Sequence, residues 1–386
     1  MRETKLLPTN IAPVGRAALA LAVGIALAGA GCKDSVGSTS RSAQPLIWKV
    51  PEGKGFDLGL PAVDGSAVYL EGDSGVAAFD QATGRKLWEP RLREGGHSRA
   101  ILLREGRLYS AEVGVVRSYD AATGAVLWAH PFAGPSSPDQ AVSAVDGAGV
   151  YVGTRDHRVL RLDPATGATA WEVDVGPDWP YQGMVVGLAV SGDTVYVAAK
   201  RNLSANGFDA AGVVVALRRS DGGEIWRYQT PGTRSDAFGA PVVAGSLLLV
   251  SDDYGNGLVA LRRATGAQAW RFQGQAGYGG GYSAPVVAGD TVFKGSDDTH
   301  VYAVDLATGR QIWAGRTAAS VLTIAVCGST VLANDNDVEI LARSTGKNLG
   351  HALRSTDTDF ATSGMAVAGG RAFVAGTHHV YALRCD

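Results

Sequence analysis

Three groups of residues have side chains that could carry chemistry. Cys32 directly follows an apolar stretch, where a thiol could accept a lipid. Acidic turns such as Asp297–Asp298 carry carboxylates, the ligands that calcium prefers. Cys327 and Cys385 could form a disulfide in an oxidising compartment. Each group needs a fold that positions it, so the order of strands and turns decides between these possibilities.

The N-terminus is typical of an export signal. Several basic residues precede an apolar stretch of small residues over 17–31, which is too short to span a bilayer comfortably. The stretch ends at Cys32 and resembles a bacterial lipoprotein signal, although Gly29 stands where that signal prefers Leu. We therefore expect a signal peptide over 1–31 and lipidation at Cys32. An ordinary secretory signal with an incidental cysteine is the alternative. Residues 32–44 are rich in Ser and Gly and predict a flexible tether.

No group of residues in the sequence forms a recognisable catalytic or metal site. The acidic turns lack the ligand spacing and the terminal Glu of a calcium loop, so solvated turn residues are favoured. The seven histidines lack zinc-like spacing, and no phosphate loop or nucleophile elbow occurs. We expect no catalytic residue, no metal and no cofactor. For Cys327 and Cys385 we favour two free, packed thiols over a disulfide.

Composition indicates a large globular core. The 386 residues are 46% hydrophobic and 19% charged, with 52 glycines that predict many tight turns. The net charge is −2 and no basic arm occurs, which argues against a nucleic-acid partner.

One segment recurs through most of the chain, for example as VAAFDQATGRKLW over 76–88 and VYAVDLATGRQIW over 301–313. Its tryptophan returns every 40 to 55 residues, a period typical of a propeller or a similar array. The seven positions are Trp48, Trp88, Trp128, Trp171, Trp226, Trp270 and Trp313.

Each period predicts four short strands separated by turns that contain glycine, which is one propeller blade. The last copy lacks its fourth strand, and PLIWKV at 45–50 resembles a fourth strand with nothing before it. We expect these segments to pair and to close the ring. The fold class predicted for 45–386 is all-β: an eight-bladed β-propeller of four-stranded antiparallel blades, closed by the N-terminal strand.

The repeated residues are better explained by structure than by catalysis. The glycine of Asp-x-x-Thr-Gly suits a left-handed turn, and the tryptophan four residues later is large enough to dock one blade on the next. Arg218 and Arg262 replace the acid in two copies, so the acid is not essential chemistry. Gly350 replaces the tryptophan in one copy, which predicts a weaker seam between blades seven and eight.

The Asp-x-x-Thr-Gly-x-x-x-Trp motif resembles the repeat of quinoprotein-type (PQQ-like) propellers over about 45–386. One branch of this family, the PQQ-dependent dehydrogenases, usually carries two adjacent cysteines, which this chain lacks. The other branch comprises lipid-anchored, non-enzymatic scaffolds that assist β-barrel assembly at the outer membrane. That resemblance implies an outer-membrane protein that faces the periplasm and binds the barrel-assembly protein or other envelope proteins. An envelope scaffold or sensor with another protein or glycan partner is the alternative.

In that branch, loops between blades near the middle of the chain contact the barrel protein. The matching loops here are 176–183 and 230–240, and the fourth period also contains a long insertion at 200–212. A packed loop aromatic and an interface anchor are equally plausible for Trp179. The residues that we select for partner binding are Trp179, Tyr181, Phe208, Arg234 and Asp236.

The lipidation hypothesis predicts that Cys32→Ser releases the protein from the membrane fraction, because the thiol that accepts the lipid is absent. Fractionation of cells that express each form measures this. A variant that stays in the membrane fraction would contradict lipidation at Cys32.

Overall fold

The structure, a computed structural model, describes residues 46–51, 60–72, 75–89, 100–112, 114–132, 142–181, 183–205, 209–230, 234–235, 237–252, 257–275, 283–334, 337–354, 364–376 and 379–385. The expected signal peptide, Cys32 and the tether lie outside these ranges and remain predictions. In the described ranges the chain forms strands and turns, and no helix there is long and apolar enough to cross a membrane.

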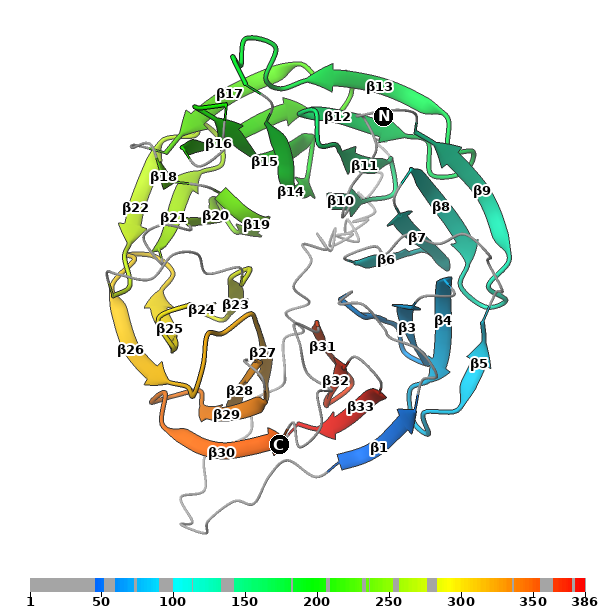
Figure 1. Cartoon of the computed structure of the whole chain (residues 1–386), viewed down its shortest axis with the longest axis vertical. Coiled ribbons are helices and arrows are strands. Elements are labelled where there is room, and N and C mark those ends of the chain that lie inside the picture. Colours follow the sequence, from blue (N-terminus) through cyan, green and yellow to red (C-terminus); the bar gives the residue numbers. More distant parts are fainter. Residues whose placement is uncertain are drawn as a thin grey trace, which may run out of the picture.

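Eight separate sheets stand around a common centre, as Figure 1 shows. The four main strands of each sheet are antiparallel to their neighbours, and their order leads from the centre to the rim. Seven sheets have four strands, and the fourth blade carries an additional short strand. The predicted fold class, an eight-bladed β-propeller, is confirmed.

Blades 1 to 4 follow one another along the chain. Their strands are β2 (Ala62–Val63), β3 (Ala67–Gly72), β4 (Gly75–Asp80) and β5 (Lys86–Trp88) in blade 1; β6 (Ile101–Arg104), β7 (Arg107–Glu112), β8 (Val115–Asp120) and β9 (Val126–Pro131) in blade 2; β10 (Val142–Val145), β11 (Val150–Gly153), β12 (Arg158–Leu162) and β13 (Thr169–Asp174) in blade 3; and β14 (Met184–Ser191), β15 (Thr194–Asn202), β16 (Ala210–Arg218), β17 (Glu224–Gln229) and β18 (Arg234–Ser235) in blade 4.

Blades 5 to 8 complete the ring. Their strands are β19 (Ala237–Ala244), β20 (Leu247–Asp252), β21 (Gly257–Arg262) and β22 (Gln268–Phe272) in blade 5; β23 (Val286–Ala288), β24 (Thr291–Gly295), β25 (His300–Asp305) and β26 (Gln311–Arg316) in blade 6; β27 (Thr323–Cys327), β28 (Thr330–Asn334), β29 (Val338–Ala342) and β30 (Asn348–Leu353) in blade 7; and β31 (Met365–Ala368), β32 (Arg371–Ala375), β33 (His379–Arg384) and β1 (Leu46–Pro51) in blade 8.

Blade 8 is built from both ends of the chain. β1 pairs antiparallel with β33, from Leu46 opposite Leu383 to Pro51 opposite His379. This pairing gives the last blade its outer strand and covers the edge that β33 would otherwise expose. The closure predicted from the sequence is confirmed.

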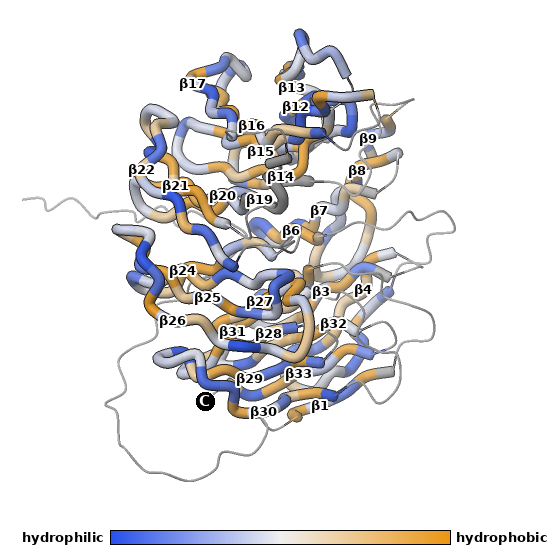
Figure 2. Tube along the Cα trace, turned by 60° about the vertical axis from the view of Figure 1, so that its left-hand side comes forward, coloured by the Kyte–Doolittle hydropathy of each residue, from blue (hydrophilic) through white to orange (hydrophobic). Residues whose placement is uncertain are grey.

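The core consists of apolar layers between neighbouring blades. Leu249 and Leu258 of blade 5, for example, pack with Val292 and Tyr302 of blade 6. Strand interiors are mostly hydrophobic and turns mostly hydrophilic, which Figure 2 shows along the trace. Because side chains alternate between the two faces of a sheet, each blade contributes to two layers.

The repeated turn is held by its own side chains. In blade 1, one carboxylate oxygen of Asp80 accepts bonds from the Thr83 hydroxyl at 2.7 Å and the Thr83 N–H at 2.8 Å. These bonds, the hydroxyl bond first, hold the pKa of Asp80 below its usual range. Gly84 has φ +74° and donates its N–H to the Asp80 carbonyl at 2.9 Å. Arg262 replaces the acid in blade 5 and its carbonyl still accepts from Gly266 at 2.8 Å, which explains why the acid is replaceable.

Each tryptophan lies over the turn glycine of the next blade. The Trp226 indole donates to the Arg263 carbonyl at 2.8 Å, and a Cβ on Gly266 would stand 2.5 Å from the Trp226 ring. The tryptophan and glycine pairs with this arrangement are Trp48–Gly84, Trp88–Gly124, Trp128–Gly167, Trp171–Gly222, Trp226–Gly266, Trp270–Gly309 and Trp313–Gly346.

A β-bulge precedes each of these tryptophans. In blade 6, Ala303 pairs with Trp313 while Val304 pairs with Gln311, which leaves Ile312 as the extra residue. The bulge turns this side chain outward, so Ile312 is 52% exposed. Aliphatic residues are exposed at the same place in other blades, namely Leu87, Leu127, Ile225 and Leu349.

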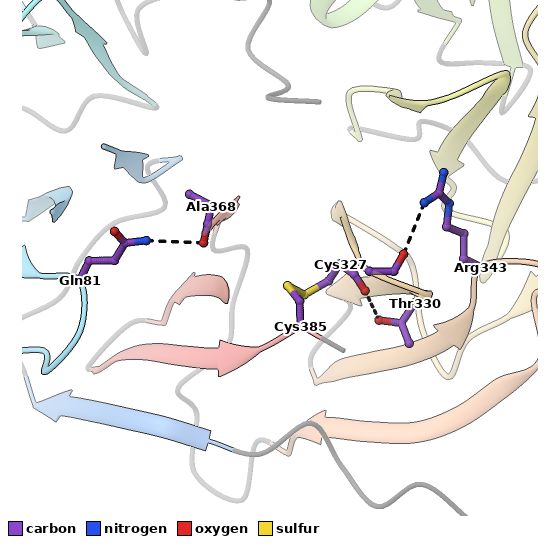
Figure 3. Close-up of a disulfide and its surroundings, with 7 residues drawn as sticks. Gln81, Cys327, Thr330, Arg343, Ala368 and Cys385 are labelled. Atoms are coloured by element: carbon purple, nitrogen blue, oxygen red, sulfur yellow. Dashed lines mark hydrogen bonds between the residues drawn. A yellow bond between two sulfur atoms is a disulfide. The ribbon is translucent and has the colours of Figure 1, made fainter. Parts of the chain in front are cut away.

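The seam between blades 7 and 8 differs from the others. Gly350 stands in the tryptophan position, and no atom of a neighbouring residue lies within 4 Å of where its Cβ would be. At this seam Cys327, the last residue of β27, is joined by a disulfide to Cys385, as Figure 3 shows. The expectation of two free thiols was therefore wrong. The expected weakness at this seam is offset by a covalent bond between the two blades.

Cys385 stands at the turn position whose carbonyl accepts the indole hydrogen bond in other blades. Its N–H donates to the Gly370 carbonyl at 2.8 Å, and in blade 2 the equivalent Ala121 N–H donates to Gly106 at 2.9 Å. The Ala121 carbonyl in turn accepts from the Trp88 indole. The disulfide thus attaches to the same point of the turn on which a tryptophan docks elsewhere.

The docking geometry predicts different costs for two glycine substitutions. Gly266→Ala places a Cβ against the Trp226 ring, whereas Gly245→Ala, also at positive φ, meets no atom within 4 Å. We expect Gly245→Ala to cost about 1 kcal/mol for the left-handed backbone. Gly266→Ala should cost a further ~1–3 kcal/mol because the ring must move. Urea unfolding of both variants measures this, and equal midpoints would contradict the docking role.

The disulfide predicts redox-dependent stability. It closes a sequence separation of 58 residues, for which chain entropy gives about 4 kcal/mol. We expect Cys327→Ser with Cys385→Ser to lose a stability of this order. Urea unfolding with and without a reductant measures it. Reductant should lower the stability of the wild type to that of the double variant and leave the double variant unchanged.

Candidate functional site at the loop end of blade 4

The loops between blades and the loops between second and third strands emerge from the same end of the sheets, here called the loop end. At the loop end of blade 4, Lys200 of β15 pairs with Met184 of β14 and with Gly212 of β16. Ala211 of β16 then pairs with Ser235 of β18. The sheet order β14–β15–β16–β18 therefore brings together the three segments that the sequence analysis selected.

The insertion at 200–212 is strand at both of its ends. β15 and β16 each extend over nine residues, and Arg201 and Asn202 pair with Ala211 and Ala210. The loop itself is therefore shorter than the insertion, and β18 supplies a second partner to the start of β16. Phe208 lies outside the described residues.

Trp179 is a packed loop aromatic. A Cβ on either Gly176 or Gly183 would stand within 2.4 Å of its ring, so these glycines make room for the indole. The ring centroid lies 5.2 Å from that of His157, and His157 Nδ1 lies 2.7 Å from an Asp174 carboxylate oxygen. The side chain packs on the core between blades 3 and 4. Trp179 thereby fixes the loop rather than presenting itself to solvent.

Tyr181 is the aromatic that this loop exposes. It follows Trp179 by two residues and is 40% exposed. An exposed tyrosine on a loop that is fixed at its base loses little entropy on binding, and tyrosine is enriched at interface hot spots. Three aromatic residues were predicted for partner binding, and of the two that the structure describes, Tyr181 is the better placed.

The other two selected residues lie on the loop between blades 4 and 5. Arg234 belongs to β18, and its backbone pairs with Ala210. Asp236 lies outside the described residues. No pattern in the sequence predicted β18, because two residues without periodicity do not indicate a strand.

Charged side chains beside this site are largely paired. Arg158 contacts Asp156 at 3.3 Å and donates to Glu172. The bond to Glu172 raises the pKa of Arg158 above its ordinary value. Arg201 donates to the Gln229 side chain at 3.3 Å. An exposed aromatic among paired charges is typical of a protein interface.

A buried charged cluster in blade 6 escaped the sequence analysis. Lys294 is fully buried and donates to the Gly295 carbonyl at 2.7 Å. Asp298 accepts from the Tyr302 hydroxyl at 2.6 Å, and burial raises the pKa of Asp297. Across the described ranges, no three His, Cys, Asp or Glu side chains come together as a metal site.

Comparison with known proteins identifies the family. The family described as "Outer membrane protein assembly factor BamB" matches residues 33–178 and 155–323. The structure of BamB from Moraxella catarrhalis is 19% identical, with a TM-score of 0.70 over 89% of this chain and 98% of that chain. The quinohemoprotein alcohol dehydrogenase from Comamonas testosteroni is 15% identical, with a TM-score of 0.70 over 89% of this chain and 76% of that chain.

A curated relative shares part of the repeat array. The serine/threonine-protein kinase AfsK of Streptomyces griseus is 27% identical over 179 residues, which cover 44% of this chain and 21% of the kinase. The match thus spans about a fifth of the kinase. The family match covers most of the propeller and ends at residue 323, where blade 7 begins. The chain therefore belongs to the family of PQQ-like propellers described as outer membrane protein assembly factor BamB.

Proposed function

We propose that this protein is a non-enzymatic scaffold that assists the assembly of outer-membrane β-barrel proteins. A lipid at Cys32 would hold it on the outer membrane, facing the periplasm. Membership of the BamB family supports the role. The observation that carries it within the molecule is the convergence of three irregular segments at the loop end of blade 4.

The mechanism is presentation of a rigid surface. The blades around β14 to β18 hold the loop base through the packed Trp179, and Tyr181 stands exposed beyond it. The paired charges around the site, such as Arg158 with Glu172, would give the interface a polar rim. The barrel-assembly protein of the outer membrane, or another envelope protein, is the partner that we propose.

Two alternatives predict other partners or a reaction. An envelope scaffold or sensor would use the same surface for another protein or a glycan. A PQQ-dependent dehydrogenase would need a quinone site, and only the shared fold favours that alternative. In this chain Cys327 and Cys385 are not adjacent in sequence, and their thiols are bonded to each other across blades 7 and 8.

Affinity purification from envelope extracts tests the proposal. We expect the wild type to recover the barrel-assembly protein, and Tyr181→Ala to weaken the recovery roughly tenfold, as for a hot-spot residue worth ~1.4 kcal/mol. Leu127→Ala is the matched control, because this side chain is at least as exposed and lies on the rim of blade 2. It should leave the recovery unchanged.

Two results would contradict the proposal. Repeated purification without the barrel-assembly protein would remove the specific role and leave the fold intact. Uptake of pyrroloquinoline quinone, with reduction of a dye by an alcohol or a sugar, would instead favour the dehydrogenase.

A further inference from the structure

Carboxylates are distributed unevenly over the end of the propeller opposite the loop end. This turn end consists of the turns between first and second strands and between third and fourth strands. Each of blades 1 to 4 has one carboxylate in each of these two turns, for example Asp146 and Asp163 in blade 3. In blades 5 to 8, the described turns contain only Asp290 and Asp305, both in blade 6.

Four consecutive blades carry an exposed cation at the turn end. These are Arg262 in blade 5, Arg310 in blade 6, Lys347 in blade 7 and Arg384 in blade 8. Among the described residues, none of the four side chains donates a hydrogen bond or forms an ion pair. Arg310 acts on Asp305 through its charge alone. We call these four residues the basic sector.

The two adjacent arginines of blade 4 at the turn end are paired with carboxylates. Arg219 contacts Asp146 at 2.9 Å and Asp193 at 3.0 Å, and Arg218 contacts Asp221 at 2.7 Å. Both arginines belong to blade 4. Because the described turns of blades 5 to 8 contain few carboxylates, the cations of the basic sector give this half of the turn end a positive field.

Three further arginines add charge beside the basic sector. Arg263 donates to the Ser191 carbonyl, Arg343 to the Ala288 carbonyl and Arg371 to the Gln81 carbonyl. These bonds fix each guanidinium at a seam between blades. Because carbonyls carry no net charge, all three positive charges remain uncompensated.

The chain enters the propeller beside this sector. Leu46, where β1 begins, lies opposite Leu383, and Arg384 follows directly. Residues 33–45 separate Leu46 from Cys32 and can span at most about 45 Å when extended. Leu46 is 49% exposed, and Ile312 and Leu349 are exposed near the same end. Cations next to exposed aliphatic side chains suit the headgroup region of a bilayer.

We infer that the basic sector docks on a membrane surface of anionic phospholipids. Phosphate headgroups would neutralise the four exposed cations, and the aliphatic residues would contact the acyl boundary. This inference rests on the proposed lipid anchor, which would keep the turn end near the bilayer. The loop end of blade 4, at the other end of the strands, then faces away from the membrane and stays accessible to a protein partner.

Vesicle flotation with the mature chain carrying Cys32→Ser tests the docking without the lipid anchor. We expect this protein to float with vesicles of phosphatidylglycerol and phosphatidylethanolamine, and not with phosphatidylcholine vesicles. High salt should abolish the flotation. Arg262→Gln with Arg310→Gln should weaken the partitioning about 30-fold, from roughly 1 kcal/mol per cation.

Arg218→Gln with Arg85→Gln is the matched control. These residues occupy the same two turn positions in blades 4 and 1, and the change in charge is identical. The control should keep its flotation. An equal loss of flotation in the two double variants would overturn the inference. Equal flotation with phosphatidylcholine vesicles, or retention on RNA without vesicle binding, would overturn it as well.

The proposed function and this inference fail separately. Arg262→Gln with Arg310→Gln should still recover the barrel-assembly protein from detergent extracts, where no bilayer is present. If this double variant loses flotation but still recovers the barrel-assembly protein, both proposals are supported. Intact recovery of the barrel-assembly protein with a Cys32→Ser chain that never floats overturns the docking alone.

Discussion

The contact between a tryptophan indole and the turn glycine of the next blade governs this structure. It requires a glycine because the ring occupies the space of a Cβ, and it requires positive φ because the turn must present its carbonyl to the indole N–H. Trp128, for instance, packs on Gly167 and donates to the Pro164 carbonyl at 3.1 Å. Every blade except blade 7 thus contacts the next through one ring and one hydrogen bond.

A ring of such contacts must also close. Trp48 on β1 makes the same contact with blade 1 as the other tryptophans make with their neighbours, so the N-terminal strand both completes blade 8 and docks it. The disulfide from Cys327 to Cys385 secures blade 8 on its other side, where Gly350 leaves no ring. Blade 8, which depends on both chain ends, therefore has an indole contact on one side and a covalent bond on the other.

The sequence was sufficient to predict the number of blades, because the same pattern of strands and turns recurs in every period. It did not predict the disulfide, because Cys327 and Cys385 lie 58 residues apart and meet only when blades 7 and 8 pack together. It also did not show that β15 and β16 extend into the insertion at 200–212, where β16 pairs with β18 as well. Exposed Tyr181 and packed Trp179 differ only in tertiary contacts, which no local pattern contains.

The same periodicity that specifies the fold makes its departures informative. Where the sequence follows the repeat, its side chains pack between blades or stabilise turns, and few of them are available for binding a partner. Where Arg262 replaces the acid of the turn, the turn keeps its backbone bonds and gains an exposed charge. Where loops lengthen at blade 4, a fifth strand and an exposed tyrosine appear. Because the two departures occupy opposite ends of the strands, one propeller can contact a membrane and a protein at the same time.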